Sequence, residues 1–206
     1  MQRQAEKERK TKETEIKVTL NIDGEGKSDI KTGIGLLDHM LELFAFWGHF
    51  DLSIAAKGDL NIDIHHTNED IGIVLGNAFK DALGNKEGIN RIGFASVPME
   101  EVGASVMVDI SGRGFLQSNI AGFTKKGIVS GMRPKEEEYD IKDSIHFFES
   151  FAKHLGANLN IKIDQFGSDL HTTLEPVFKA FGIALDQATQ IDPRRKGIPS
   201  TKGIID

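Results

Sequence analysis

The sequence predicts an α+β protein that contains one structural unit twice, each an antiparallel-rich sheet with helices packed on one face. Stretches that alternate apolar and polar residues are followed by stretches with apolar residues at helical spacing, and this order recurs in the second half of the chain. The motif "DIHHTNED" at residues 63–70 also has a weaker copy, "DLHTTLEP", at residues 169–176, which begins 106 residues later. An internal duplication explains both observations, and the two repeats are predicted to span residues 1–90 and 91–206.

The first repeat is predicted to contain two helices and several strands. Its first strand pair is indicated by alternation on both sides of Asp23-Gly24, a dipeptide typical of hairpin turns. Its first helix has apolar residues three and four positions apart between two glycines, and its second helix ends at Gly84. The predicted elements are a β-hairpin at 13–33, a helix at 35–48, a strand or hairpin at 51–63 and a helix at 66–84.

The second repeat is predicted to follow a similar order, with turns at Pro98 and Gly112. Proline is tolerated in the first turn of a helix, so the helix that contains Pro176 is expected to begin a few residues earlier. The charged residues 132–143 predict a solvated loop, and the tail from residue 192 has too much proline and glycine for a regular element. The predicted elements are strands at 91–99 and 102–120, a helix at 143–157, a strand at 158–166 and a helix at 171–189.

The composition excludes several classes of function. The chain has 206 residues, is 39% hydrophobic and 27% charged, and has a net charge of −6, which argues against nucleic acid as the main partner. It has no cysteine, so it has no thiol nucleophile, disulfide or thiolate metal site. The charged start "MQRQAEKERK" is not a signal peptide, and no apolar run approaches the roughly 20 residues of a membrane span. A cytoplasmic protein without membrane or nucleic-acid partners is expected.

Two pairs of residues suggest metal binding. His65 and Glu69 are four residues apart in a predicted helix, as are His171 and Glu175, and side chains at this spacing lie roughly 5–6 Å apart on one face. Imidazole with carboxylate suits Mn, Fe, Co or Zn better than Ca or Mg. His66 lies about 100° around the helix from His65 and must point to a different ion or to none. The alternative is that these polar residues only cap the helix starts.

Longer segments of the chain carry a resemblance to a known family. They include "GLLDHMLELF", "GDLNIDIHHTNEDIGIVLGNAF", "GINRIGFASVPMEE", "DISGRG", "FFESFA", "EPVFKAFGIAL" and "PSTKG". In this order they resemble imidazoleglycerol-phosphate dehydratase, from about residue 8 to the C-terminus. The chain is thereby identified as a member of that family.

The resemblance implies a function, a cofactor and an assembly. The family dehydrates imidazole-glycerol phosphate to imidazole-acetol phosphate in histidine biosynthesis and depends on manganese. Two metal ions in each active site hold the substrate ring as an imidazolate, which accepts electrons while hydroxide departs. The resemblance also implies a hollow homo-oligomer of twenty-four chains, with metal ligands drawn from neighbouring subunits.

The resemblance assigns metal ligands at named positions. Carried over, the second metal site retains His65 and Glu69, while Asn160 and Thr172 stand where we expect the family to have histidines. Trp47 stands where the family has a histidine that contacts substrate. Three other histidines are candidates to compensate, namely His49, His146 and His154. The first metal site is complete and takes His39, His66, His171 and Glu175.

The remaining site residues follow from the same resemblance. Glu13 of "KTKETE" is the leading acid/base candidate and also contacts substrate, and Glu101 of "PMEE" is the second candidate. Cationic and polar groups at five positions, some of them in the C-terminal substrate-binding tail, are expected to hold the phosphate: Arg91, Arg113, Lys179, Ser200 and Lys202.

The missing histidines leave a second interpretation open. A non-catalytic family member, or one with a shifted substrate, would retain one intact metal site and the phosphate-binding groups. Whole-chain resemblance favours the dehydratase.

Overall fold

The computed structural model describes residues 3–120 and 139–205. Its first repeat forms a four-stranded sheet in the order β1-β2-β4-β3, in which β1 pairs antiparallel with β2, β2 pairs antiparallel with β4, and β3 pairs parallel with β4. The elements are β1 (Gln4–Lys10), β2 (Thr14–Asn21), β3 (Ser28–Lys31), α1 (Gly35–Trp47), β4 (Asp51–Gly58) and α2 (His65–Leu83).

The second repeat reproduces this topology strand for strand. Its sheet has the order β5-β6-β8-β7, again with two antiparallel pairs and one parallel pair. The elements are β5 (Ile92–Met99), β6 (Val102–Asp109), β7 (Phe115–Ser118), α4 (Ile141–Leu155), β8 (Asn158–Ile163) and α5 (Leu170–Thr189). The predicted α+β fold with a duplicated unit is therefore confirmed.

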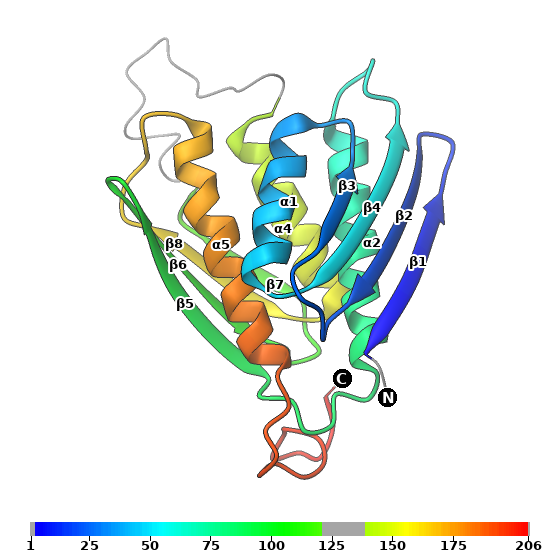
Figure 1. The fold of residues 1–206 in the computed structure, drawn as a ribbon, viewed down its shortest axis with the longest axis vertical. Helices are drawn as coiled ribbons and strands as arrows, with labels where there is room; N and C mark the ends of the chain where they lie inside the picture. The colour runs from blue at the N-terminus through cyan, green and yellow to red at the C-terminus, as the bar shows by residue number, and fades with distance from the viewer. Residues whose placement is uncertain (1–2, 121–138, 206) are drawn as a thin grey trace.

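The four helices lie between the two sheets (Figure 1). Helices α1 and α2 cover the first sheet, α4 and α5 cover the second, α2 packs on α4, and α1 packs on α5. Alternate residues of each strand, such as Ile16, Val18 and Leu20 of β2, are buried against the helices. The centre is filled by phenylalanine rings in mutual contact, among them Phe44, Phe79, Phe151 and Phe181. One core therefore joins both repeats.

The predicted hairpin at residues 13–33 is wrong. β2 and β3 do form, but β4 lies between them and pairs with both. The apolar side of β2 lies opposite Ile54 and Leu52 of β4, so burial is satisfied by a strand from beyond α1. β1 was not predicted either, because "QAEKERK" has almost no apolar residues. It pairs only with β2, at the edge of the sheet.

Two prolines also depart from the predicted positions. Pro98 is not in a turn but in β5, opposite Gly103, where an edge strand tolerates the missing N–H group. The turn follows at Glu100, which adopts a left-handed φ of 50°. Pro176 lies in the second turn of α5, and the helix begins at Leu170, as the expectation of an earlier start required.

The α4 region also corrects the prediction. Helix α4 begins at Ile141, two residues earlier than predicted, because Asp140 caps it. The predicted loop at residues 132–143 therefore ends at the helix start, and its residues 132–138 lie outside the described residues.

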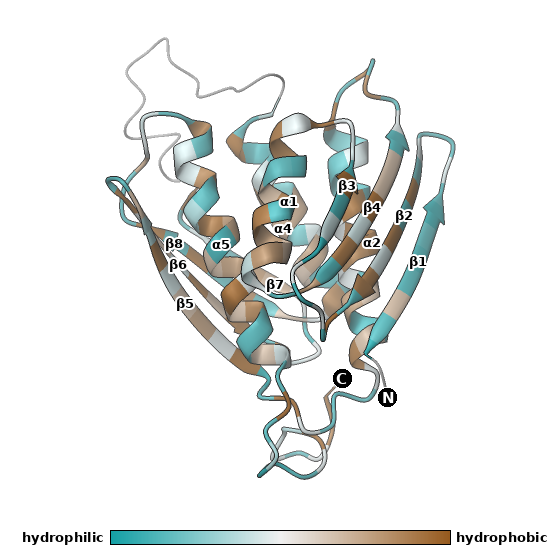
Figure 2. Cartoon of the chain, in the orientation of Figure 1, coloured by the Kyte–Doolittle hydropathy of each residue, from teal (hydrophilic) through white to brown (hydrophobic). Residues whose placement is uncertain are grey.

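The outward faces of the two sheets differ in character. The first sheet carries Glu8, Glu15, Lys17, Lys31 and Lys57 around a shallow surface depression. The second sheet exposes large apolar side chains, and Figure 2 shows the difference between β1 and β5. The exposed apolar residues of the second sheet are Ile92, Phe94, Met107 and Phe115.

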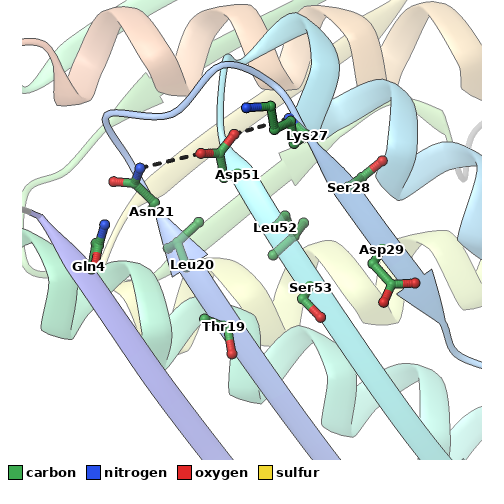
Figure 3. A pocket seen from close by; sticks show the side chains of 10 residues that line it. All are labelled: Gln4, Thr19, Leu20, Asn21, Lys27, Ser28, Asp29, Asp51, Leu52 and Ser53. Atoms are coloured by element: carbon green, nitrogen blue, oxygen red, sulfur yellow. Dashed lines mark hydrogen bonds between the residues drawn. The ribbon is translucent and has the colours of Figure 1, made fainter.

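The first residues of β4 and β8 hold equivalent loops by different means. Asp51 accepts hydrogen bonds from the backbone N–H groups of Glu25 and Lys27 and faces Asn21 (Figure 3). Asn158 instead donates to the Ser111 hydroxyl and to the carbonyl of Arg113.

Within the described residues, we find no helix with the length and apolar character that a membrane crossing needs.

Candidate metal centre

The first turns of all four helices lie at one end of the molecule (Figure 1). His39 of α1 stacks on His171 of α5, with ring centroids 5.0 Å apart. The Nε2 atom of His171 is 2.8 Å from Oε2 of Glu175, and Nε2 of His39 is 3.7 Å from the same oxygen. Three of the four residues predicted for the first metal site are thus together, on two helices from different repeats.

Glu175 is ionised in this environment. Burial alone would raise the pKa of its carboxyl, but hydrogen bonds from Lys179 and His171 outweigh burial and lower it. Lys179 lies one turn further along α5, with Nζ 2.6 Å from Oε1 of Glu175 and 5.9 Å from the centroid of the Trp47 ring. Lys179 and Trp47 therefore border the first cluster, and the predicted contact of Lys179 with the phosphate stays a prediction.

A second cluster forms where α2 packs on α4. The Nδ1 atom of His65 is 3.1 Å from Nδ1 of His146. The other ring nitrogen of His65, Nε2, is 3.6 Å from Oε2 of Glu69. One ligand atom each from His65, Asp143 and His146 lie within 4.8 Å of one another. Of the three histidines predicted to compensate, His146 is the one brought to a predicted metal ligand.

His66 points away from His65 and belongs to a third cluster, as the helical geometry predicted. Its Nδ1 atom is 3.1 Å from Oδ2 of Asp59 and 3.9 Å from Oε2 of Glu13. The hydrogen bond with Asp59 raises the pKa of the His66 imidazole, and the charge of Glu13 adds to this. His66 is not close to His39 and His171 within one chain, so the predicted four-ligand first site is not formed by one chain alone.

The turn that carries Glu13 is held by buried Asp70. Thr14 donates its hydroxyl to Oδ2 of Asp70 at 2.5 Å, and Nε of Arg9 donates to Oδ1 at 2.8 Å. Inside the turn, the hydroxyl oxygen of Thr11 accepts the N–H groups of Glu13 and Thr14. Asp70 belongs to the motif that contains His65 and His66, so this motif positions both the histidines and Glu13.

Most of the predicted phosphate-binding groups lie at the opposite end. Arg91 binds Asp109 through Nε at 2.6 Å and donates Nη1 to the carbonyl of Pro199 at 3.0 Å, next to Ser200. Its N–H group donates to the carbonyl of Ala188, near the end of α5. Glu175 is 13 residues earlier on the same helix, or about 20 Å away at 1.5 Å per residue. Arg113, Ser200 and Lys202 lie at this end too, in the β6–β7 turn and the tail.

Other predicted residues lie away from the clusters. Glu101 is in the β5–β6 turn and belongs to none of the three. Asn160 is in β8 opposite Met107 and Gln117, and it alternates with buried Leu159 and Ile161, so it faces away from the helices. The side chain of Asn160 thus lies on the outer face of the second sheet, whereas His146 contacts His65 where α2 packs on α4.

The remaining candidates have structural surroundings. Thr172 is buried, and its N–H group donates to Asp169, which caps α5. His49 lies in the turn after α1, and His154 donates Nδ1–H to the carbonyl of Ser150 near the end of α4. Neither belongs to a cluster.

Sequence reasoning missed three carboxylates that contact the clusters or the turn beside them, namely Asp59, Asp70 and Asp143. Asp59 and Asp70 flank the two histidines in "GDLNIDIHHTNED". Buried ligand histidines commonly donate their second nitrogen to a carboxylate, so such flanking residues were the available signal. Asp143 has a weaker signal, its spacing of three residues from His146.

Comparison with known proteins gives a consistent result. The family model for imidazoleglycerol-phosphate dehydratase matches residues 32–185. Imidazoleglycerol-phosphate dehydratase of Pelobacter propionicus is 51% identical over 205 residues and covers 100% of both chains. The enzyme of Geobacter metallireducens is 50% identical over 205 residues, covering 98% of this chain and 99% of its own.

Solved structures agree in fold. The enzyme of Staphylococcus aureus superposes with a TM-score of 0.76 and 32% identity, covering 92% of this chain and 99% of its own. The enzyme of Pyrococcus furiosus, in complex with (S)-C348, gives a TM-score of 0.77 and 34% identity, covering 96% and 99%. With its clusters of histidine and carboxylate on a duplicated fold, this chain belongs to the imidazoleglycerol-phosphate dehydratase family.

Proposed function

We propose that this chain is a hydro-lyase that dehydrates imidazole-glycerol phosphate to imidazole-acetol phosphate in histidine biosynthesis, using two divalent metal ions, expected to be Mn²⁺. The observation that carries the proposal is the gathering of histidine and carboxylate clusters at one end of a chain that matches its dehydratase relatives over nearly its whole length.

The donor atoms of this chain fit such ions. Imidazole nitrogen and carboxylate oxygen form the mixed set that Mn and its neighbours accept. His39, His171 and Glu175 would hold one ion together with His66 of a neighbouring copy, and His65, Glu69 and His146 would hold the other. Bound ions of this type act as Lewis acids and fix the orientation of the substrate ring.

Glu13 is placed to move a proton. Dehydration removes one proton from carbon and one hydroxide from the neighbouring carbon, so a group that takes and gives protons is needed beside the ring. The Glu13 carboxylate lies on an exposed turn, 3.9 Å from His66, and the hydrogen bond from Thr14 to Asp70 holds this turn against α2, the helix that carries His66. Asp59 holds Nδ1 of His66, which leaves Nε2 as the ligand atom. Glu101 lies outside these contacts, and we propose no role for it.

The separation of the two ends supports a homo-oligomeric site. Arg91 and the tail with Ser200 and Lys202 lie about 20 Å from Glu175 in one chain, by the length of α5. A small phosphorylated substrate does not span that distance. We propose that the cationic end of one copy meets the metal end of another, in the twenty-four-chain assembly that the family resemblance implies.

The alternative, a member with one metal site, depends on the missing histidines. Because His146 lies beside His65, the absence of a histidine at residue 160 no longer argues for a lost metal site. The absence of histidines at Thr172 and Trp47 still does. These two positions favour a changed substrate or metal preference over a loss of the site.

Complementation tests the function directly. Expression in a histidine auxotroph that lacks the dehydratase should restore growth, because both proposed metal clusters and Glu13 are present. His171→Ala should abolish growth and lower activity by at least about 100-fold. Losing a residue that only contacts a metal ligand costs up to about 100-fold, and losing the ligand itself should cost more. His154→Ala is the matched control and should grow. Soluble, assembled wild-type protein without growth would contradict the dehydratase assignment.

A further inference from the structure

We propose that Asp143 is a fourth ligand of the second metal ion, so that this chain builds that site from its own His65, Glu69, Asp143 and His146. The inference rests on the proposed function, because that function supplies the ion. It adds a residue that neither the sequence motif nor the family resemblance assigned. Asp143 would also supply the donor atom that an imidazole was expected to supply at residue 172, where this chain has threonine.

The geometry of α4 brings Asp143 to the cluster. Asp143 and His146 are three residues apart in the first two turns of α4, so they share one face of the helix. One ligand atom from each lies within 4.8 Å of the other and of His65. Donor atoms around one ion with bonds of about 2.1 Å are separated by roughly 3–4 Å, so small side-chain rotations close the set. In this structure Glu69 faces Nε2 of His65 and His146 faces Nδ1, so the imidazole must turn for one of its nitrogens to share an ion with Glu69.

The two helices are held in register at this point. Asn68 is fully buried on α2, and its Nδ2 donates to the carbonyl of Asp143 at 2.7 Å. Its Oδ1 accepts the hydroxyl of buried Tyr139 at 3.1 Å. Gly72, one turn further along α2, lets the backbone of α4 approach, because a Cβ there would lie 2.7 Å from the carbonyl oxygen of Phe147. The neighbouring Glu69, Asp143 and His146 are thereby fixed relative to each other.

The capping role of Asp143 does not account for its surroundings. Its Oδ2 atom accepts the N–H group of Asp140 at 2.8 Å, as in a capping box. One of its oxygens also lies within 4.8 Å of a ligand atom of His65 and of one of His146, so the carboxylate faces two imidazoles as well as the cap. A cation at this point would be attracted by the carboxylate and bound by the facing imidazole nitrogens.

A carboxylate in place of an imidazole changes the metal preference. Oxygen donors favour Mn²⁺, and nitrogen donors favour Zn²⁺ and later metals. A site with two carboxylates and two imidazoles is therefore expected to discriminate less strongly for Zn²⁺ over Mn²⁺ than a site with three imidazoles.

Manganese titration tests the inference. Chelator-treated protein is titrated with Mn²⁺, and free Mn²⁺ is read by its paramagnetic resonance signal. The wild type should bind about two ions per chain in two affinity classes. Asp143→Asn keeps an oxygen acceptor for the cap but loses the charge, and should weaken one class at least about 10-fold while the other stays unchanged. Asp143→Glu keeps the carboxylate and the usual capping-box residue type, and should bind within a few-fold of wild type.

The control is Asp140→Asn, which removes one charge from the same helix start without touching the cluster. It should change both classes less than about 3-fold, and Mn²⁺ should raise its Tm as it does for the wild type. Unchanged binding by Asp143→Asn, with two ions still bound, would overturn the role of Asp143 and leave the proposed function standing. A wild type that binds only one ion would instead contradict the two-metal function itself.

Discussion

The starts of α2 and α5 occupy the same place in the two repeats and meet matching partners. His65 of α2 contacts His146 of α4, and His171 of α5 stacks on His39 of α1. In both cases the second histidine comes from the helix that precedes the last strand of the other repeat. These two clusters are therefore built across the duplication, whereas the cluster of Glu13, Asp59 and His66 lies within the first repeat.

The next residue shows where the two copies differ. His66 and Thr172 are equivalent, but His66 reaches Asp59 and Glu13, whereas Thr172 is buried and its N–H group is used in the helix cap. Asp169 accepts the N–H group of Thr172, and the equivalent Asp63 accepts that of His65. Both helix starts therefore keep an aspartate acceptor, and the two copies differ in the side chain at this position.

The largest effect is expected from removing the histidine that each cluster takes from the opposite repeat. His39→Ala and His146→Ala should each lose about one bound Mn²⁺ per chain and lower kcat by at least about 100-fold, because each removes a ligand nitrogen. Metal analysis and steady-state kinetics measure both. If only one of the two variants loses metal, the two clusters are not equivalent.

An intermediate effect is expected from the glycines that let the helices cross. A Cβ on Gly76 would lie 2.7 Å from the carbonyl oxygen of Phe151, and one on Gly182 would lie 2.5 Å from that of Phe44. These residues are again equivalent, 106 positions apart. Gly76→Ala and Gly182→Ala should each reduce the free energy of unfolding by about 1–3 kcal/mol in denaturant titrations.

Gly84→Ala is not a neutral control for these variants, because Gly84 has a φ of 54°. Ala78→Gly, in the middle of α2, measures a helix-propensity cost of about 1 kcal/mol together with the loss of a buried methyl group, and creates no clash. Equal stability of wild type and both alanine variants would contradict the close helix crossing.

The smallest effect on stability is expected from substitutions of Asp51 and Asn158, which hold equivalent loops in the two repeats. The N–H group of Glu25 and then that of Lys27 hold the pKa of Asp51 below its usual value of 3.8, against the effect of burial. A carboxyl with a lowered folded pKa stabilises the protein above its unfolded pKa, and this contribution is lost as the pH falls through the folded value. Asp51→Asn should cost about 1 kcal/mol at neutral pH and less below about pH 3.

Urea titrations at pH 7 and pH 3 measure this difference. Asn158→Asp in the equivalent loop provides the comparison, since an ionised carboxylate there would face the hydroxyl oxygen of Ser111 and the carbonyl of Arg113. It should destabilise more at pH 7 than at pH 3. An Asp51→Asn variant with the same cost at both values would contradict a charge-dependent loop contact.

The helices were predictable from the sequence because the apolar residues that each helix buries recur at helical spacing within one short segment. α1 carries an apolar stripe at helical spacing, and Gly84 ends α2 as predicted. Strand order was not predictable, because β4 enters between β2 and β3 only after α1 has crossed the sheet. β1 had no apolar pattern to reveal it, since an edge strand with long charged side chains needs little burial.

The site was predicted in part for the same reason. His65 with Glu69, and His171 with Glu175, are contacts within one helix and follow from spacing. The partners His39 and His146 come from another helix, and residue spacing says nothing about which helices pack together. For His39 the resemblance supplied the answer, whereas His146 was predicted only as one of three candidates to compensate for the histidines missing at Asn160 and Thr172.

The exchange of partners between repeats also has a consequence for the origin of the fold. A half-length ancestor could have formed these contacts only by pairing two identical chains, which gives two identical clusters by symmetry. Joining the genes end to end released the copies from that constraint. One helix start was then free to keep two adjacent imidazoles, and the other to give one up.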